Sequence, residues 1–175
     1  MAPWVWIIIA VIAIIVLYII LAYNKLVRLT NQSDNAWAQI DVQLKRRIDL
    51  IPNLVETVKG YVKHEKETLT EITKARSQLQ QATTMSKRAE ASNMITESLK
   101  TLFAVAENYP KLKANQNFLS LQEELSGTES KIAYARQAYN DACLSLENSI
   151  ESFPTNILAN TFNFKKKEMF AASEK

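Results

Sequence analysis

The chain has 175 residues, of which 22% are charged and 47% hydrophobic, with a formal net charge of +3. It holds only two Gly and four Pro, whereas average usage would give roughly a dozen Gly, so the many tight turns of an all-β fold are excluded. The single cysteine, Cys143, excludes an intramolecular disulfide framework and fits a reducing compartment.

The first element is Trp4 to Tyr23, twenty consecutive residues without charge, amide, Gly or Pro. A helix of this length spans about 30 Å, which matches the hydrocarbon core of a bilayer. Residues 1–24 are therefore predicted to form a transmembrane anchor whose partner is the lipid bilayer. A cleaved signal peptide would need a basic segment before a shorter apolar core.

The flanks of this segment predict its orientation. No Lys or Arg precedes Trp4, and Lys25 and Arg28 follow Tyr23. The positive-inside bias then predicts a single-pass protein of the cell membrane, with the N-terminus outside and the C-terminal domain in the cytoplasm. Residues 25–33 are expected to be a juxtamembrane connection.

Residues 34–153 show the spacing of long helices. The first apolar row repeats every seven residues and is interrupted only at Glu65, and a second row runs beside it. The two rows are Trp37, Leu44, Ile51, Val58, Ile72 and Leu79, and Ile48, Val55, Val62 and Leu69. This pattern predicts one helix from about residue 34 to residue 81.

Pro52 lies inside this predicted helix. It removes the hydrogen bond to the carbonyl of Ile48, yet the apolar phase is the same on both sides, which favours a kinked continuous helix over a hairpin. A continuous helix gives three passes and leaves Phe153 far from the membrane. A turn at Pro52 gives four passes and brings the C-terminal tail back to the bilayer.

Two further helices follow. Residues 82–87 read as a connection, a helix is expected over about residues 88–108, and Pro110 ends it. The last helix has a bulky row paired with a mostly smaller one, typical of an antiparallel bundle. The bulky row is Phe118, Leu125, Ile132, Tyr139, Leu146 and Phe153, and the other is Leu121, Thr128, Ala135, Ala142 and Ser149. Gly127 within this helix is expected to allow close approach of another backbone.

Residues 154–175 form an aromatic and lysine-rich tail. One interpretation is that Phe162 and Phe164 cap the end of the bundle while the lysines are solvated. The alternative is that the aromatics dock on a membrane surface with Lys165, Lys166 and Lys167 in contact with anionic lipid.

Charged residues near the apolar rows are the candidate site residues. Asp41, Glu65, Arg76, Glu129 and Arg136 are expected either to pair across helices or to line a polar groove for a ligand. Lys45, Arg46 and Arg47 are expected on a solvated face or at a site for an acidic partner. They lie roughly 33 Å past the membrane end on a straight helix, too far for direct lipid contact.

No catalytic set accompanies these charges. A zinc-protease helix needs a second histidine four residues after His64, and Thr68 stands there. The sequence has no glycine-rich phosphate loop, and neither basic run is interleaved with stacking aromatics. We therefore expect no enzyme activity, no cofactor, no metal and no nucleic-acid partner.

Several mixed polar and apolar blocks resemble those of LemA family proteins. They cover nearly all of residues 23–170 and include Gln43 to Arg47, Asp49 to Val55, Tyr109-Pro110, Leu112 to Asn115, Asn117-Phe118, Leu121-Gln122, Leu125, Thr128-Glu129, Ala135-Arg136, Tyr139-Asn140 and Phe153-Pro154. The resemblance implies a bacterial or archaeal single-pass membrane protein with a cytoplasmic bundle, usually of four helices, which would favour a turn at Pro52. It implies no established catalytic activity.

The sequence thus predicts an all-α protein, with a single N-terminal transmembrane helix followed by an antiparallel bundle of three or four passes. The function expected is a non-enzymatic, membrane-anchored adaptor or scaffold with an unidentified protein partner or self-association. The alternative is a membrane-remodelling or compartment-forming protein that self-assembles on the bilayer. Its motivation is the aromatic and lysine-rich tail, together with the resemblance, which implies a link to making membrane compartments through the magnetosome-associated relatives.

Overall fold

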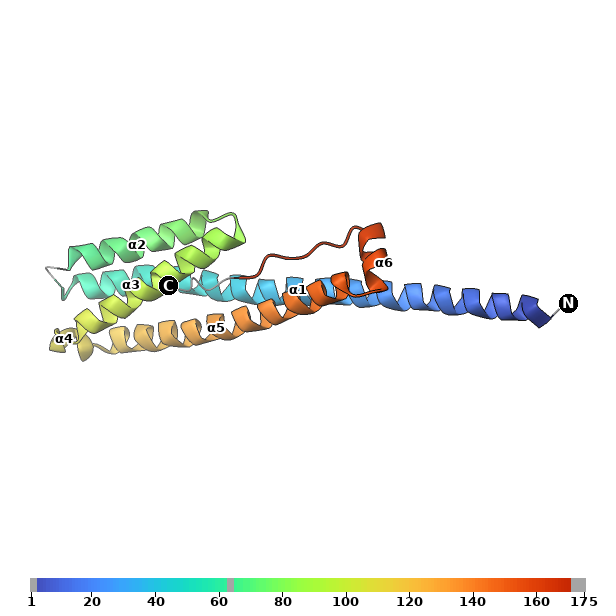
Figure 1. The fold of residues 1–175 in the computed structure, drawn as a ribbon. Coiled ribbons are helices and arrows are strands. Elements are labelled where there is room, and N and C mark those ends of the chain that lie inside the picture. The colour runs from blue at the N-terminus through green and yellow to red at the C-terminus, as the bar shows by residue number, and fades with distance from the viewer. Residues whose placement is uncertain (1–2, 63–64, 171–175) are drawn as a thin grey trace.

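The computed structural model describes residues 3–62 and 65–170, and these residues form helices and connections without any strand. The predicted all-α class is confirmed. The helices pack as an elongated rod in which α1 contacts mainly α5 and α2 contacts mainly α3 (Figure 1). The elements are α1 (Pro3–Lys59), α2 (Lys66–Gln81), α3 (Met85–Ala106), α4 (Pro110–Lys113), α5 (Gln116–Glu151) and α6 (Thr155–Thr161).

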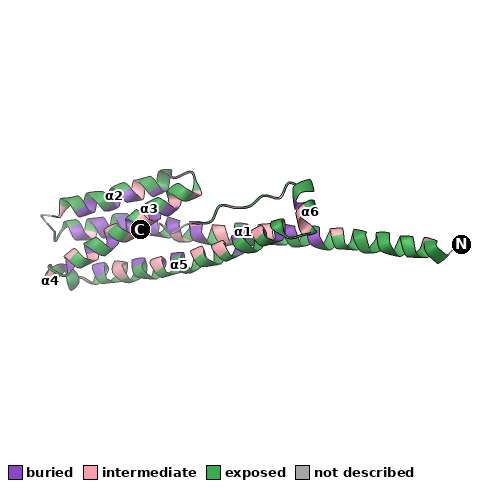
Figure 2. Cartoon of the chain, viewed as in Figure 1, coloured by how far each residue is buried: buried purple, intermediate pink, exposed green. Residues whose placement is uncertain are grey.

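The N-terminal part of α1 projects from the rod with its side chains exposed (Figure 2). Helix α1 is long and apolar enough to cross a membrane, as the run from Trp4 to Tyr23 predicts. It continues without a break through residues 25–33, the expected connection. The apolar segment and the first helix of the bundle are therefore one helix of 57 residues.

Helix α1 also continues through Pro52, as the unchanged apolar phase predicts. The carbonyl of Ile48, which Pro52 leaves without its helical donor, accepts a hydrogen bond of 2.9 Å from Nε of Arg76 in α2. An unsatisfied, partly buried carbonyl costs about 1–3 kcal/mol, so this contact offsets part of the cost of an interior proline.

Replacing Arg76 with Met is therefore expected to destabilise the chain by about 1–2 kcal/mol, because the Ile48 carbonyl loses its substitute donor. In a Pro52→Ala background the same replacement should cost less, since an alanine at this position restores the helical N–H. Thermal unfolding of the detergent-solubilised chain, followed by circular dichroism in all four members of this cycle, measures the coupling. Equal costs in both backgrounds would contradict the role given to Arg76.

The first bundle helix does not reach residue 81, and that prediction is wrong. Helix α1 ends at Lys59, next to Gly60, and α2 begins at Lys66, one residue after the interruption of the seven-residue repeat at Glu65. The rod therefore makes four passes even though Pro52 lies within α1 (Figure 1). The end of α5 returns toward the apolar part of α1. Helix α6 follows there, and the hydroxyl of its first residue, Thr155, lies 3.1 Å from that of Tyr18.

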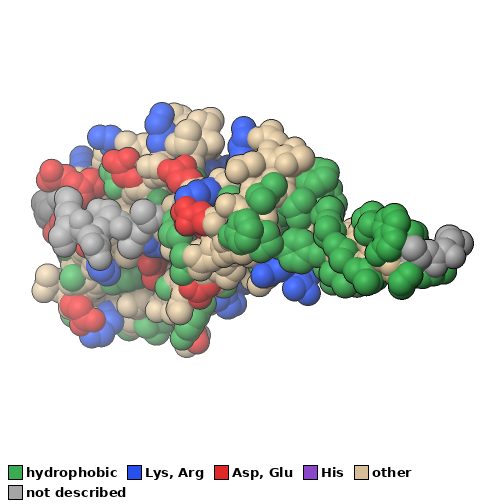
Figure 3. Space-filling model, turned by 45° about the vertical axis from the view of Figure 1, so that its right-hand side comes forward, with side chains coloured by type: hydrophobic (Ala, Val, Ile, Leu, Met, Phe, Trp, Pro, Cys, Tyr) green, Lys and Arg blue, Asp and Glu red, His purple; other side chains and the backbone are tan. Residues whose placement is uncertain are grey.

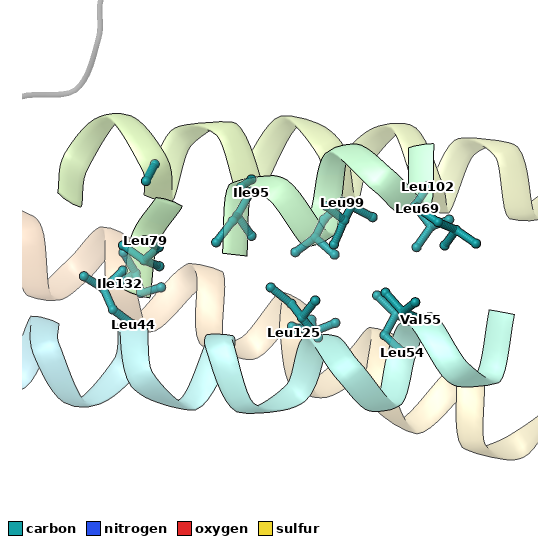
Figure 4. Close-up of a cluster of buried hydrophobic side chains, with 14 of the residues drawn as sticks. Leu44, Leu54, Val55, Leu69, Leu79, Ile95, Leu99, Leu102, Leu125 and Ile132 are labelled. Atoms are coloured by element: carbon teal, nitrogen blue, oxygen red, sulfur yellow. The ribbon is translucent and has the colours of Figure 1, made fainter. Parts of the chain in front are cut away.

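The core lies where all four long helices overlap (Figure 4). The bulky row of α5 is buried from Phe118 to Leu146, as predicted, but Phe153 is 80% exposed because α5 ends at Glu151. Helix α3 begins three residues earlier than expected, at Met85, because the Thr84 hydroxyl caps it by accepting from the backbone N–H of Lys87.

Gly127 permits no close helix contact, contrary to expectation: a Cβ added there would meet nothing within 4 Å. A Gly127→Ala variant should therefore be more stable by roughly 1 kcal/mol, because glycine is the poorer helix former. Thermal unfolding of the two proteins in detergent checks this, and a lower melting temperature for the variant would contradict it.

Candidate functional site

Four polar side chains from three helices meet inside the rod. Arg47 of α1 is fully buried. Its Nη1 donates to the carbonyl and hydroxyl oxygens of Ser92 in α3, at 3.1 and 3.2 Å. Its Nη2 donates to the Thr96 hydroxyl at 3.1 Å and forms an ion pair with Glu129 of α5. We call Arg47, Ser92, Thr96 and Glu129 the inner polar cluster.

Thr96 connects the two charges of this cluster. Its hydroxyl lies 3.0 and 3.1 Å from the two carboxylate oxygens of Glu129, and it can donate its single proton to one of them. Helices α1, α3 and α5 are thereby tied together at one level of the rod. Such a contact can be made in only one register of the three helices, so the cluster selects the packing as well as contributing to it.

Arg47 was expected on a solvated face, and the structure corrects this. Arg47 lies three residues after Leu44 and four before Ile51, which is the spacing of a buried row. That row also holds Ile40 and Leu54, both fully buried. The guanidinium replaces a core hydrophobe and requires the partners described above, since an uncompensated buried charge is costly.

The electrostatics of the cluster follow from burial. Desolvation, together with the positive charge of Arg136, lowers the pKa of Arg47 to about 10, so this guanidinium remains charged at neutral pH. Burial also lowers the pKa of Arg136, whose Nη1 donates to Oδ1 of Asn93 at 3.3 Å. The Nε of Arg47 has no partner within the described structure.

A cleft of about 960 Å³ opens beside the cluster, between α2, α3 and α5. Glu129 and Arg136 lie at its wall. The remaining lining residues are Glu71, Lys74, Glu90, Asn93, Met94, Thr96, Glu97 and Ser98. Over residues 3–62 and 65–170 no group of three His, Cys, Asp or Glu side chains could hold a metal ion. His64 lies outside the described residues.

The two other residues of the first basic run lie on the surface. Lys45 is exposed, and Arg46 forms an ion pair of 3.2 Å with Glu124 in which both side chains are close to half exposed. Exposed pairs of this kind contribute little to stability. Nearby, Asp41 pairs with Arg88, whose guanidinium lies 5.7 Å from the centre of the Trp37 ring.

The C-terminal residues occupy a second site along α1 and α5. We call residues 164–170 the tail segment. Its last residue, Phe170, is fully buried, with its ring 5.9 Å from that of Trp37 and 4.9 Å from the Arg136 guanidinium. The amide of Asn140 binds the backbone of Phe170 twice, accepting from its N–H at 2.8 Å and donating to its carbonyl at 3.2 Å.

Tyr139 completes this second site. Its hydroxyl donates to the carbonyl of Glu168 at 2.8 Å, and burial raises the pKa of Tyr139, which keeps the phenol protonated as a donor. The sequence placed Tyr139 in the buried row but did not predict that Tyr139 and Asn140 hold the tail. A signal was available in Asn140, an amide directly beside the regular apolar row.

The lysines of the tail have unequal surroundings. Lys166 pairs with Glu151 and with Glu147, at 2.9 Å to the latter, and these carboxylates raise its pKa. Lys167 pairs with Asp34 of α1. Lys165 is exposed and has no ion pair among the described residues. Two of the three lysines proposed for lipid contact thus face carboxylates of the bundle.

The aromatic residues before the lysines contact α1. The rings of Phe162 and Phe164 lie 5.0 and 5.7 Å from that of Tyr23, both in edge-to-face arrangements. Phe164 also packs against a small apolar cluster of Leu26, Leu146 and Ala159, at the end of the bundle next to the apolar segment of α1. Polar tail contacts and aromatic packing therefore fold the tail back along the rod.

Comparison with known proteins gives the family. The family model described as "LemA family" matches residues 36–175. Protein LemA of Metamycoplasma hominis is 31% identical over 152 residues, which covers 86% of this chain and 69% of that relative. The chain therefore belongs to the LemA family.

Proposed function

We propose that this protein is a non-enzymatic, membrane-anchored adaptor that presents one face of its bundle to a partner protein at a fixed position above the bilayer. The observation that carries this is the continuity of α1, since the apolar segment and the core helix are one unbroken element. From Tyr23 to Lys59 the helix rises about 54 Å, which sets the reach of the far end. A flexible linker would not fix the bundle in this way.

The polar residues support the same reading. The four members of the inner polar cluster bind one another, and the charged pair sits where it joins helices. Side chains engaged in this way hold the register of the bundle.

The contact face we propose is a groove between α1 and α5. It consists of two adjoining hollows of about 610 and 510 Å³ that share Gln39 and Ala138. Val42 is 62% exposed beside it and Tyr134 is 75% exposed. The other lining residues are Asn24, Val27, Arg28, Asn31, Gln32, Asn35, Ala36, Ala38, Gln43, Lys131, Ala135 and Ala142.

This groove has the properties of a helix-binding surface. Ala135 and Ala138 have small side chains, so another helix can approach closely between α1 and α5. An exposed tyrosine beside a groove of mixed apolar and polar residues is a common centre of binding energy in protein interfaces.

A photo-crosslinking amino acid at Tyr134 in the full-length protein, expressed in its host, tests the adaptor function. We expect a reproducible protein adduct there and at Val42. The matched control is Ala133, which is exposed on the same helix but points about 100° away. A second copy in the adduct would identify self-assembly. Absence of adducts at both groove positions, with a monomeric mass in mild detergent, would reject the proposal.

The proposed orientation, with the bundle in the cytoplasm, follows from Lys25 and Arg28 directly after the apolar segment. Protease treatment of intact cells should leave a C-terminal tag uncut, and permeabilised cells should lose it. Loss of the tag in intact cells would place the bundle and its partner outside.

A further inference from the structure

Helix α6 and the residues that flank it expose large apolar side chains beside the apolar part of α1. Phe153 is 80% exposed, Ile157 57% and Phe162 50%. We call these three residues the α6 collar. We propose that the α6 collar inserts into the headgroup and acyl boundary of the bilayer that holds the anchor, as a second membrane contact. This inference rests on the proposed membrane anchorage of α1.

The position of α6 along α1 supports the bilayer as the surface that the collar contacts. The Thr155 hydroxyl lies 3.1 Å from that of Tyr18, and the Phe162 ring packs on Tyr23. Both tyrosines belong to the last turns of the apolar segment, separated by about 8 Å along the helix axis. Interfacial helices bury their apolar side by about 5–10 Å, so α6 lies at the depth such helices occupy when the apolar segment spans the membrane.

The composition of this region fits the same boundary. Residues 153–164 contain no charged side chain, and Lys165 follows them directly. Lys25 and Arg28 of α1 are exposed just past Tyr23. Apolar and aromatic side chains followed by cations are the order expected on passing from the acyl region into the headgroups.

The residues around α6 adjoin the anchor directly, through the contacts with Tyr18 and Tyr23. Apolar side chains cover the projecting part of α1 and extend onto the adjoining end of the bundle, while charged side chains gather over the remainder of this face (Figure 3). Exposed apolar patches mark interaction sites, and a patch that adjoins a membrane span at this depth would be covered by lipid. A second contact away from the axis of α1 would restrict rotation and tilt of the rod.

Spin labelling of the full-length chain, reconstituted alone into vesicles of phosphatidylcholine and phosphatidylglycerol, tests this. Single cysteines are placed at Ile157, Phe153, Ile12 or Tyr134 in a Cys143→Ala background, and each label is probed with oxygen and with a water-soluble nickel complex. Tyr134 is the matched control because it is a similarly exposed aromatic on α5, about 26 Å before the end of that helix at Glu151. Ile12 reports the anchor itself.

We expect the ratio of oxygen to nickel accessibility to be several-fold higher at Ile157 and Phe153 than at Tyr134, and highest at Ile12. Water-like ratios at Ile157 and Phe153, with a lipid-like ratio at Ile12, would overturn the second contact and leave the anchor intact. Water-like ratios at all four positions would overturn both the anchor and this inference.

Discussion

Replacing Glu129 with Gln is expected to lower the stability of the chain by about 2–3 kcal/mol, because Arg47 is fully buried and would lose its countercharge. Removing one partner of a fully buried ion pair costs roughly 3–5 kcal/mol. The cost expected for Glu129→Gln is below that range because the Glu129 side chain is 40% exposed. Thermal unfolding of the detergent-solubilised chain should show a melting temperature lower by about 5–10 °C.

The reverse change should be milder. Arg47→Met places a hydrophobe of similar length in an apolar row and leaves a carboxylate that already reaches water, so the expected cost is below about 1.5 kcal/mol. The double variant should resemble Arg47→Met alone. Glu124→Gln is the matched control, since it removes the exposed partner of Arg46 from the same helix pair and should change stability by less than about 0.5 kcal/mol. A larger loss from Arg47→Met than from Glu129→Gln would contradict the buried-charge argument.

The features that the sequence predicted are those that depend on local spacing. Twenty apolar residues in succession and the regular row from Phe118 to Leu146 define helices whatever surrounds them. The continuity of α1 through Pro52 was predicted for the same reason, because the apolar phase did not change. What the sequence did not show is how the proline is compensated, since Arg76 lies 28 residues from Ile48 and binds its backbone carbonyl.

The end of α1 was missed because two helices happen to share one repeat. Val58 in α1 and Ile72 in α2 are fourteen residues apart, so the seven-residue spacing continued across a turn. Gly60 and the interruption at Glu65 were the available signals, and they mark the place where α1 ends and α2 begins. Because this helix end was missed, a helix continuous through Pro52 was expected to give three passes, whereas the structure has four.

The candidate site was predicted in part. Glu129 and Arg136 stood near the apolar rows, but Arg47 was grouped with Lys45 and Arg46 by sequence proximity. Its place in the core depends on helical phase, and its acceptors include a main-chain carbonyl, which no residue type identifies. The binding of the tail by Asn140 was equally hidden, because both of its bonds go to the backbone of Phe170.

Replacing Phe170 with Ala is expected to release the tail segment from the rod. The ring is fully buried beside Trp37 and Arg136, and truncating a buried phenylalanine costs about 3–5 kcal/mol. This lost free energy should mainly weaken docking of the tail segment onto the rod and change global unfolding little, because the four long helices keep their own core. At about 3 kcal/mol, the undocked fraction and hence tryptic cleavage at Lys165 to Lys167 should rise roughly a hundredfold.

Met169→Ala provides the matched control for this experiment. Met169 belongs to the same segment but is 38% exposed, so its truncation should change the cleavage rate far less. Asn140→Ala should act like Phe170→Ala in direction, since it removes both backbone bonds to Phe170 without touching the segment itself. Equal cleavage rates in Phe170→Ala and the unmodified chain would mean that Phe170 does not hold the tail on α1 and α5.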